Sequence, residues 1–127
     1  LTAVEYGDKR IFLVNGDVAG FVNRIPNAGE FLANIHQGAS CEATELTEFE
    51  RNTIHKIAPF LKRQGLIFVG LDFIGGYLTE INITSPSAIR QINQAMGLNV
   101  HKVMVDSMLA SIAEASLYHC CSKKNAA

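Results

Sequence analysis

Residues 66–84 read Leu66-Ile-Phe-Val-Gly-Leu-Asp-Phe-Ile-Gly-Gly-Tyr-Leu-Thr-Glu-Ile-Asn-Ile-Thr84. The first part, up to Phe73, is a nearly continuous apolar run that is short enough for a strand buried on both faces. Gly75-Gly76 supplies a turn, and a second strand is expected from Tyr77 to Thr84. The segment therefore predicts a β-hairpin with a buried first strand.

Two acidic side chains, Asp72 and Glu80, stand in this otherwise apolar hairpin. Burying an isolated carboxylate is too costly unless another group compensates its charge, and a divalent cation is one such group. Glu80 and Asn82 are two residues apart, so they project from the same face of a strand. Carboxylate and amide oxygens suit a hard cation such as Mg²⁺. The alternative is an edge hairpin on which Glu80 and Asn82 simply face water.

The register of the hairpin distinguishes these two interpretations. A two-residue turn pairs Ile74 with Tyr77 and sends Asp72 and Glu80 to opposite faces of the sheet. A three-residue turn pairs Ile74 with Leu78 and places the two acids opposite each other on one face. A shared cation therefore predicts the longer turn.

The residues before this hairpin predict a second hairpin and a helix. Apolar runs on both sides of Asn15-Gly16 predict a hairpin over residues 10–22. Thr47 and Glu50 form a capping box, and the helix that follows ends near Gly65. Between them, residues 24–44 show no hydrophobic periodicity, which is typical of either a functional lid or a poorly ordered surface loop.

Two further helices are expected after the central hairpin. Ser85 is placed as an N-cap with Pro86 at the first helical position, and this helix extends to Met96. Another helix follows from Asn99 to about Leu117. Its expected core stripe consists of Val100, Val103, Met104, Ser107, Met108 and Ile112. The order of elements predicts an α+β fold with an antiparallel sheet packed against helices.

Composition limits the class of protein. The 127 residues are 48% hydrophobic, with 11 Lys and Arg against 12 Asp and Glu, which suits one compact domain. Near-neutral charge without a basic block argues against nucleic acid, and no apolar run approaches the roughly 20 residues that cross a bilayer. The three cysteines favour a reducing, cytoplasmic compartment. The start at a residue other than Met predicts a piece of a longer protein.

The chain resembles the bacterial-type glutathione synthetases, which are ATP-grasp ligases. The resemblance depends on the runs Gly65-Leu-Ile-Phe-Val-Gly-Leu-Asp72, Leu78-Thr-Glu-Ile-Asn82 and Thr84-Ser-Pro86, with Gly7-Asp-Lys-Arg10 and Arg24-Ile-Pro26 in the same order. It covers about residues 7–110. Related ATP-grasp ligases typically place Pro-Gly where this chain has Thr84-Ser85-Pro86, which favours glutathione synthetase.

The resemblance implies a role for each of several residues. It implies that Asp72, Glu80 and Asn82 bind Mg²⁺ or Mn²⁺, and that Arg10 and Asn82 contact ATP. It also implies that Arg10 and Arg24 act in catalysis, because guanidinium groups can hold phosphate oxygens. Arg24, with Ser85 and Pro86, would border the peptide substrate. Without the resemblance, the two arginines read as surface residues that flank a hairpin.

The implied reaction transfers the γ-phosphoryl group of ATP to γ-glutamylcysteine, after which glycine attacks the acyl phosphate to give glutathione. The implied fold is the C-terminal part of an ATP-grasp domain over residues 1–119, with a mobile lid over 25–44 and a disordered tail over 120–127. Leu32 stands in this lid where the family commonly has Arg.

The resemblance also implies that the N-terminal part of the enzyme is missing. The expectation is a chain that is inactive alone, whose full-length form is a homo-oligomer. Two alternatives stay open. One is a non-catalytic ATP-grasp module that acts in protein interaction, and the other is an ATP-dependent carboxylate-amine ligase with another acceptor.

Overall fold

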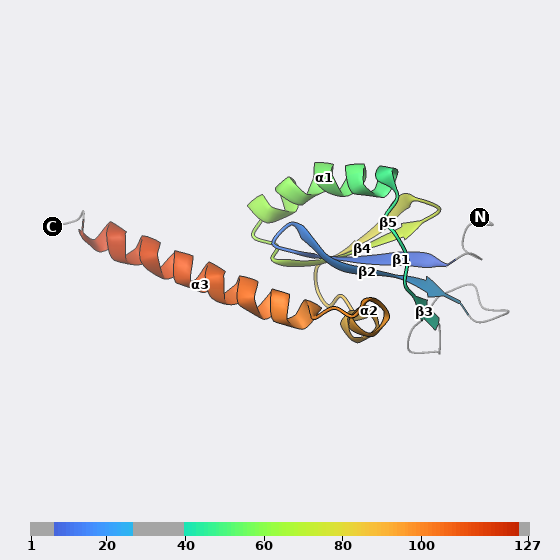
Figure 1. Cartoon of the computed structure of the whole chain (residues 1–127). Helices are drawn as coiled ribbons and strands as arrows, with labels where there is room; N and C mark the ends of the chain where they lie inside the picture. Colours follow the sequence, from blue (N-terminus) through green and yellow to red (C-terminus); the bar gives the residue numbers. More distant parts are fainter. Residues whose placement is uncertain (1–6, 27–39, 125–127) are drawn as a thin grey trace.

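The protein is an α+β domain built on one antiparallel sheet, as the sequence predicts (Figure 1). The computed structural model describes residues 7–26 and 40–124, with side chains up to residue 116. The five strands lie in the order β3-β2-β1-β4-β5. The elements are β1 (Asp8–Val14), β2 (Asp17–Ile25), β3 (Ser40–Glu42), α1 (Glu48–Arg63), β4 (Phe68–Ile74), β5 (Tyr77–Asn82), α2 (Ile89–Met96) and α3 (Val100–Lys124).

The sheet separates two apolar clusters, one under each helical layer. Alternate residues of β1 illustrate the division, since Ile11 and Leu13 pack toward α1 while Phe12 packs toward α2. Ile54 of α1 completes the first cluster, and Ile92 of α2 the second. This division leaves the N-terminal half of β1 and its neighbouring strands to carry polar side chains on the α2 face.

The first hairpin forms as predicted around Asn15-Gly16. Both residues have positive φ, 52° and 88°, which is the conformation that an Asn-Gly turn supplies. A β-bulge between Phe12 and Leu13 shifts the register beyond the turn, so that Asp8 lies opposite Arg24. The bulge therefore decides which polar residues meet at the far end of this hairpin.

The predicted capping box begins α1. Thr47 Oγ1 accepts a hydrogen bond from Glu50 N at 3.2 Å, and Glu50 Oε2 accepts one from Thr47 N at 2.8 Å. Glu50 Oε2 also accepts a hydrogen bond from Lys9 Nζ of β1 at 2.8 Å, although Glu50 is only 2% exposed. The cap thus also attaches α1 to the sheet.

The central hairpin has a two-residue turn, so the prediction of a three-residue turn is wrong. Ile74 pairs with Tyr77 across Gly75-Gly76, yet Asp72 still lies directly opposite Glu80. A bulge between Asp72 and Phe73 makes both statements compatible, because one extra residue of β5 restores the shared face. β5 ends at Asn82 rather than at the predicted Thr84.

The helix after the hairpin begins at Ile89, so the predicted cap at Ser85 and Pro86 is wrong. Ala88 precedes the helix in the left-handed region, with φ of 92° and no side-chain cap. The residues before it are held by the sheet instead: a Cβ on Gly70 would meet Pro86 Cβ at 2.8 Å. Contacts with the sheet therefore override the local helix signal.

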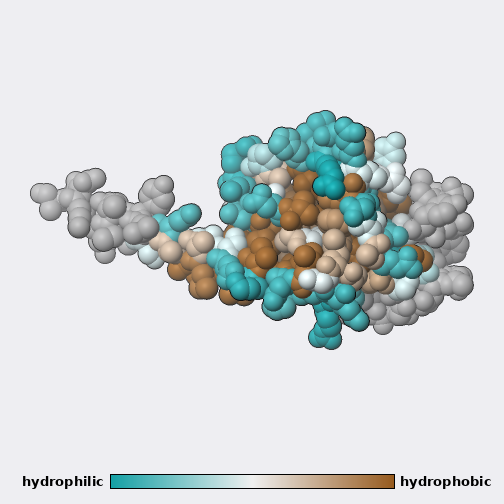
Figure 2. All heavy atoms as spheres, in the orientation of Figure 1, coloured by the Kyte–Doolittle hydropathy of each residue, from teal (hydrophilic) through white to brown (hydrophobic). Residues whose placement is uncertain are grey.

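α3 leaves the sheet after its first turns and projects away from it (Figures 1 and 2). Val100 is buried, but Val103, Met108 and Ile112 are exposed, so the predicted core stripe is wrong beyond the start of the helix. The helix also passes its predicted end at Leu117, and residues 120–124 are helical rather than a disordered tail. The sequence from 100 to 124 contains no Gly or Pro that would end it.

The predicted lid over 25–44 lies largely outside the described residues, which omit 27–39 and with them Leu32. Within its described part, Ser40–Glu42 forms the edge strand β3 and pairs with the end of β2. No helix of the described residues is both long enough and apolar enough to cross a membrane.

Candidate functional site

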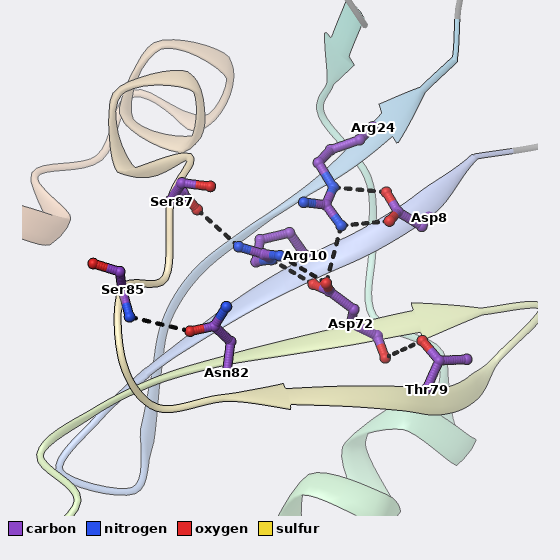
Figure 3. A network of polar contacts seen from close by, with 8 residues as sticks. All are labelled: Asp8, Arg10, Arg24, Asp72, Thr79, Asn82, Ser85 and Ser87. Atoms are coloured by element: carbon purple, nitrogen blue, oxygen red, sulfur yellow. Dashed lines mark hydrogen bonds and ion pairs between the residues drawn. The ribbon is translucent and has the colours of Figure 1, made fainter. Parts of the chain in front are cut away.

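Polar side chains from four strands meet on the α2 face of the sheet (Figure 3). The register places Asp8 opposite Arg24, Arg10 opposite Asp72, and Asp72 opposite Glu80. Directly opposed residues project from the same face, and Asp8 and Arg10 are two residues apart on β1, so they share that face. The pairs thus form two adjacent rows on one face, Arg24–Asp8 and Arg10–Asp72–Glu80, which together are called the charged row. The structure thus brings together the predicted site residues Arg10, Arg24, Asp72 and Glu80.

Arg10 and Asp72 form the centre of this row. Arg10 Nη2 donates to Asp72 Oδ2 at 2.6 Å, and Arg10 Nε donates to Asp72 Oδ1. Arg10 Nη1 also donates to the carbonyl oxygen of Ser87 at 3.2 Å. Both charged residues are 5% exposed, so the interpretation of Arg10 as a surface residue is wrong.

Arg24 joins two carboxylates. Its Nε donates to Asp8 Oδ1 at 2.6 Å, its Nη2 donates to Asp8 Oδ2, and its Nη2 lies 3.1 Å from Asp72 Oδ2. Burial on its own lowers the pKa of Arg24, but the hydrogen bonds and charges of Asp8 and Asp72 outweigh burial and raise that pKa. Arg24 is 7% exposed and permanently charged, so it too is not a surface residue.

The charges of this buried network balance. Two guanidinium groups, Arg10 and Arg24, face two carboxylates, Asp8 and Asp72. In the described part of the chain, every buried side-chain nitrogen or oxygen has a hydrogen-bond partner. Such pairs are costly to break singly, because the remaining partner becomes an uncompensated buried charge.

Glu80 lies at the end of the charged row, on the edge strand β5. Its side chain is exposed and makes no hydrogen bond or ion pair with the described residues, and it lies opposite Asp72. Asn82 lies two positions further along β5, half-buried, and its Oδ1 accepts a hydrogen bond from Ser85 N at 3.3 Å. Glu80 therefore adds a negative charge that the network does not neutralise.

These oxygens have the chemistry of a hard-cation site. Asp72, Glu80 and Asn82 offer two carboxylates and one amide, the donor types that Mg²⁺ accepts while it keeps water or phosphate ligands. Among the described residues, no group of three or more His, Cys, Asp or Glu side chains could hold a metal ion. The predicted set contains only two such side chains, so phosphate and water oxygens would have to complete the shell.

The segment after β5 lies over this face. Pro86 packs on Gly70, and the Ser87 carbonyl faces Arg10, while Ser85 is held by Asn82. The predicted substrate residues Ser85 and Pro86 therefore lie beside the charged row. A separate cleft of about 480 Å³ lies between α1 and the β1–β2 turn, and none of the row's residues lines it.

Asp8 and Ser87 were missed as members of the site. Counting back from the Asn15-Gly16 turn in a regular ladder places Asn23, not Arg24, opposite Asp8. The bulge in β1–β2 shifts this pairing by one residue. Ser87 takes part through its carbonyl oxygen, for which the residue type carries no signal.

Residues 1–97 match the family described as prokaryotic glutathione synthetase, ATP-grasp domain. The chain belongs to this family. Among curated relatives, the glutathione synthetase of Thermosynechococcus vestitus is 50% identical over 97 residues, which are 76% of this chain and 30% of the relative. The glutathione synthetase of Prochlorococcus marinus is 45% identical over 112 residues, 88% of this chain and 36% of the relative. The chain thus spans about a third of the length of these relatives.

A comparison with solved structures shows the same fold. The ATP-grasp ligase PsnB, solved with a phosphomimetic variant of its minimal precursor, Mg and ADP, superposes with a TM-score of 0.56. The match covers 81% of this chain and 31% of that chain at 16% identity. At this identity the likeness concerns the fold alone, which agrees with the family membership.

Proposed function

We propose that the chain forms the C-terminal part of a glutathione synthetase, which joins γ-glutamylcysteine to glycine with ATP. The family and the names of its relatives support this reaction. The observation that carries the proposal is the position of Asp72, held between two buried arginines and directly opposite Glu80. The buried charges balance and Glu80 adds one free carboxylate, so the site suits a divalent cation that in turn binds a polyphosphate.

In this proposal, Asp72, Glu80 and Asn82 hold Mg²⁺, or Mn²⁺ with the same ligands. The bound cation would neutralise charge on the ATP phosphates. Arg10 and Arg24 present guanidinium groups that bind phosphate oxygens and orient the transferred group. Their carboxylate partners keep both groups fixed before a nucleotide arrives, so little reorganisation is needed on binding.

The peptide substrate would lie against Arg24 and the segment that contains Ser85 and Pro86. The γ-phosphoryl group is transferred to the glycine-proximal carboxylate of γ-glutamylcysteine, with release of ADP. The amine of glycine then attacks the acyl carbon, loses a proton and expels phosphate as the amide bond forms. No protein nucleophile is required, since positioning and charge neutralisation supply most of the catalysis.

The remaining two thirds of the relatives' length would supply the other contacts to nucleotide and substrates. We therefore propose that this chain does not form glutathione alone and that the N-terminal part of the enzyme is its partner. The full-length protein would be a cytoplasmic homo-oligomer. Detectable glutathione formation by the purified chain would contradict this part of the proposal.

Calorimetry with a nonhydrolysable ATP analogue tests the retained site, with and without Mg²⁺. Binding is expected to require Mg²⁺ and to be lost in Glu80→Ala, because Glu80 is the exposed member of the ligand set. Glu114→Ala is the matched control, since it removes another exposed acid, from α3. Binding that is equal in the two variants would contradict the proposed ligand set, and no binding by the folded chain would favour a non-catalytic module.

A further inference from the structure

The bulge in the central hairpin decides which face of the sheet receives Glu80. From the turn, Ile74 pairs with Tyr77 and Phe73 pairs with Leu78. The next residue of β4, Asp72, then pairs with Glu80 and leaves Thr79 as the extra residue. β5 therefore changes its facing at Thr79.

A regular ladder would reverse this arrangement. Asp72 would then lie opposite Thr79, and Glu80 would lie opposite Leu71, which is fully buried in the apolar cluster under α1. A slip of one residue moves every later side chain to the other face, so Asn82 would move with Glu80. Asp72 would then share its face with neither of them.

Thr79, the extra residue of the bulge, makes one side-chain hydrogen bond to the opposite strand. Its Oγ1 donates to the carbonyl oxygen of Asp72 at 3.0 Å (Figure 3). At a bulge, two residues of one strand face a single residue of the other, so the ladder is locally interrupted. The hydroxyl group thus bonds to the main chain of the residue at which the register shifts.

We propose that Thr79 is a positioning residue that holds β5 in the register placing Glu80 and Asn82 beside Asp72. It acts through the hydroxyl group and the Asp72 carbonyl, not through contact with a ligand. The use of this register for a cation rests on the proposed function. The register itself does not depend on it, and the two can be tested separately.

The test compares Thr79→Val with Thr79→Ser in the whole chain. Val keeps the β-branched shape and the strand preference but removes the hydroxyl group, whereas Ser keeps the hydroxyl group. Interstrand nuclear Overhauser effects identify the residue opposite Asp72, and amide hydrogen exchange reports opening at those residues of Glu80–Asn82 whose amides bond to β4, since β5 is an edge strand.

In Thr79→Val, exchange of these β5 amides is expected to rise about fivefold to tenfold, because one hydrogen bond is lost. If the register shifts instead, the Asp72–Glu80 contacts are replaced by contacts between Asp72 and residue 79. Thr79→Ser is expected to keep the native contacts and exchange rates. Native contacts and exchange in Thr79→Val would overturn the proposal, as would equal changes in both variants.

Mn²⁺-induced relaxation at the Asp72 and Glu80 amides provides a second readout. This relaxation is expected in the native chain and in Thr79→Ser, and it is expected to be weaker in Thr79→Val. If the native chain shows no such relaxation, the proposed cation site fails, while the exchange and contact measurements still decide the role of Thr79.

Discussion

Arg10 and Asp72 lie opposite each other on β1 and β4, and the guanidinium group of Arg10 donates two hydrogen bonds to the Asp72 carboxylate. Arg24 approaches the same carboxylate from β2. Asp72 is therefore the carboxylate that both buried guanidinium groups share, and its removal tests the network most directly.

Asp72→Asn is expected to lower the free energy of unfolding by about 3–5 kcal/mol, because it leaves two buried guanidinium groups with one carboxylate. Urea unfolding measures this change. Glu80→Gln is the control on the same face, and because Glu80 is exposed and makes no ion pair with the described residues, its effect is expected within about 0.5 kcal/mol. Similar values for the two variants would contradict a structural role for the network.

The contact between Lys9 and Glu50 gives a second prediction about stability. Glu50 is 2% exposed, caps α1 through Thr47 N and binds Lys9 Nζ at 2.8 Å. Glu50→Ala is expected to cost about 3 kcal/mol or more, because it also leaves the Lys9 ammonium without its carboxylate. Thr47→Ala removes only the cap and is expected to cost about 1 kcal/mol.

Glu48→Ala is the control for this pair, since Glu48 is an exposed acid in the same first turn of α1. Its effect is expected to stay below that of Thr47→Ala. A cost for Glu50→Ala no greater than for Thr47→Ala would show that the bond between β1 and α1 contributes little.

Short-range signals in the sequence predict the local structure well. Asn15-Gly16 supplies both positive φ values of its turn, and Thr47 and Glu50 form the capping box that their spacing indicates. These features depend only on residues within a few positions of each other. The fold class follows from the order of the elements that such local patterns indicate.

The sequence pattern does not predict the two bulges or the late start of α2. The register shifts at Phe12/Leu13 and at Asp72/Phe73 decide which charged residues meet. Helix α2 starts late because Pro86 packs on Gly70, a contact between residues that are far apart in the chain. The exposure of α3 likewise follows from where the helix points, not from its apolar stripe.

Cys41 gives a prediction about pH, since it lies opposite Arg24 at the edge of the sheet. Burial raises the pKa of its thiol, an effect that Arg24 reduces and Asp8 increases, with a net rise above the ordinary value of 9.0. The folded chain then holds the proton more tightly than the unfolded chain. Its contribution to stability is therefore complete below pH 9 and is lost as the pH rises through the folded pKa.

Alkylation in a background of Cys120→Ser and Cys121→Ser measures this shift. Cys41 is expected to react more slowly in the folded chain than in urea at pH 8.5, because less of it is thiolate. Cys41→Ser is expected to remove its share of the decline in unfolding free energy above pH 9. A folded thiol that titrates below 9.0 would contradict the prediction.

A substitution at Gly70 tests whether close packing holds the segment after β5 against the charged row. A Cβ at this position would lie 2.8 Å from Pro86 Cβ, and the proline ring cannot turn aside as a flexible side chain can. Gly70→Ala is expected to cost about 1–3 kcal/mol and to move the Ser87 carbonyl away from Arg10, which amide chemical shifts of residues 85–88 would record. Gly20→Ala is the matched control, because its Cβ would meet Ile92 Cγ2 at 2.6 Å and disturb α2 instead. If both variants lose stability but only Gly70→Ala changes the chemical shifts of residues 85–88, close packing on Gly70 holds this segment. Unchanged chemical shifts in Gly70→Ala would show that other contacts hold these residues.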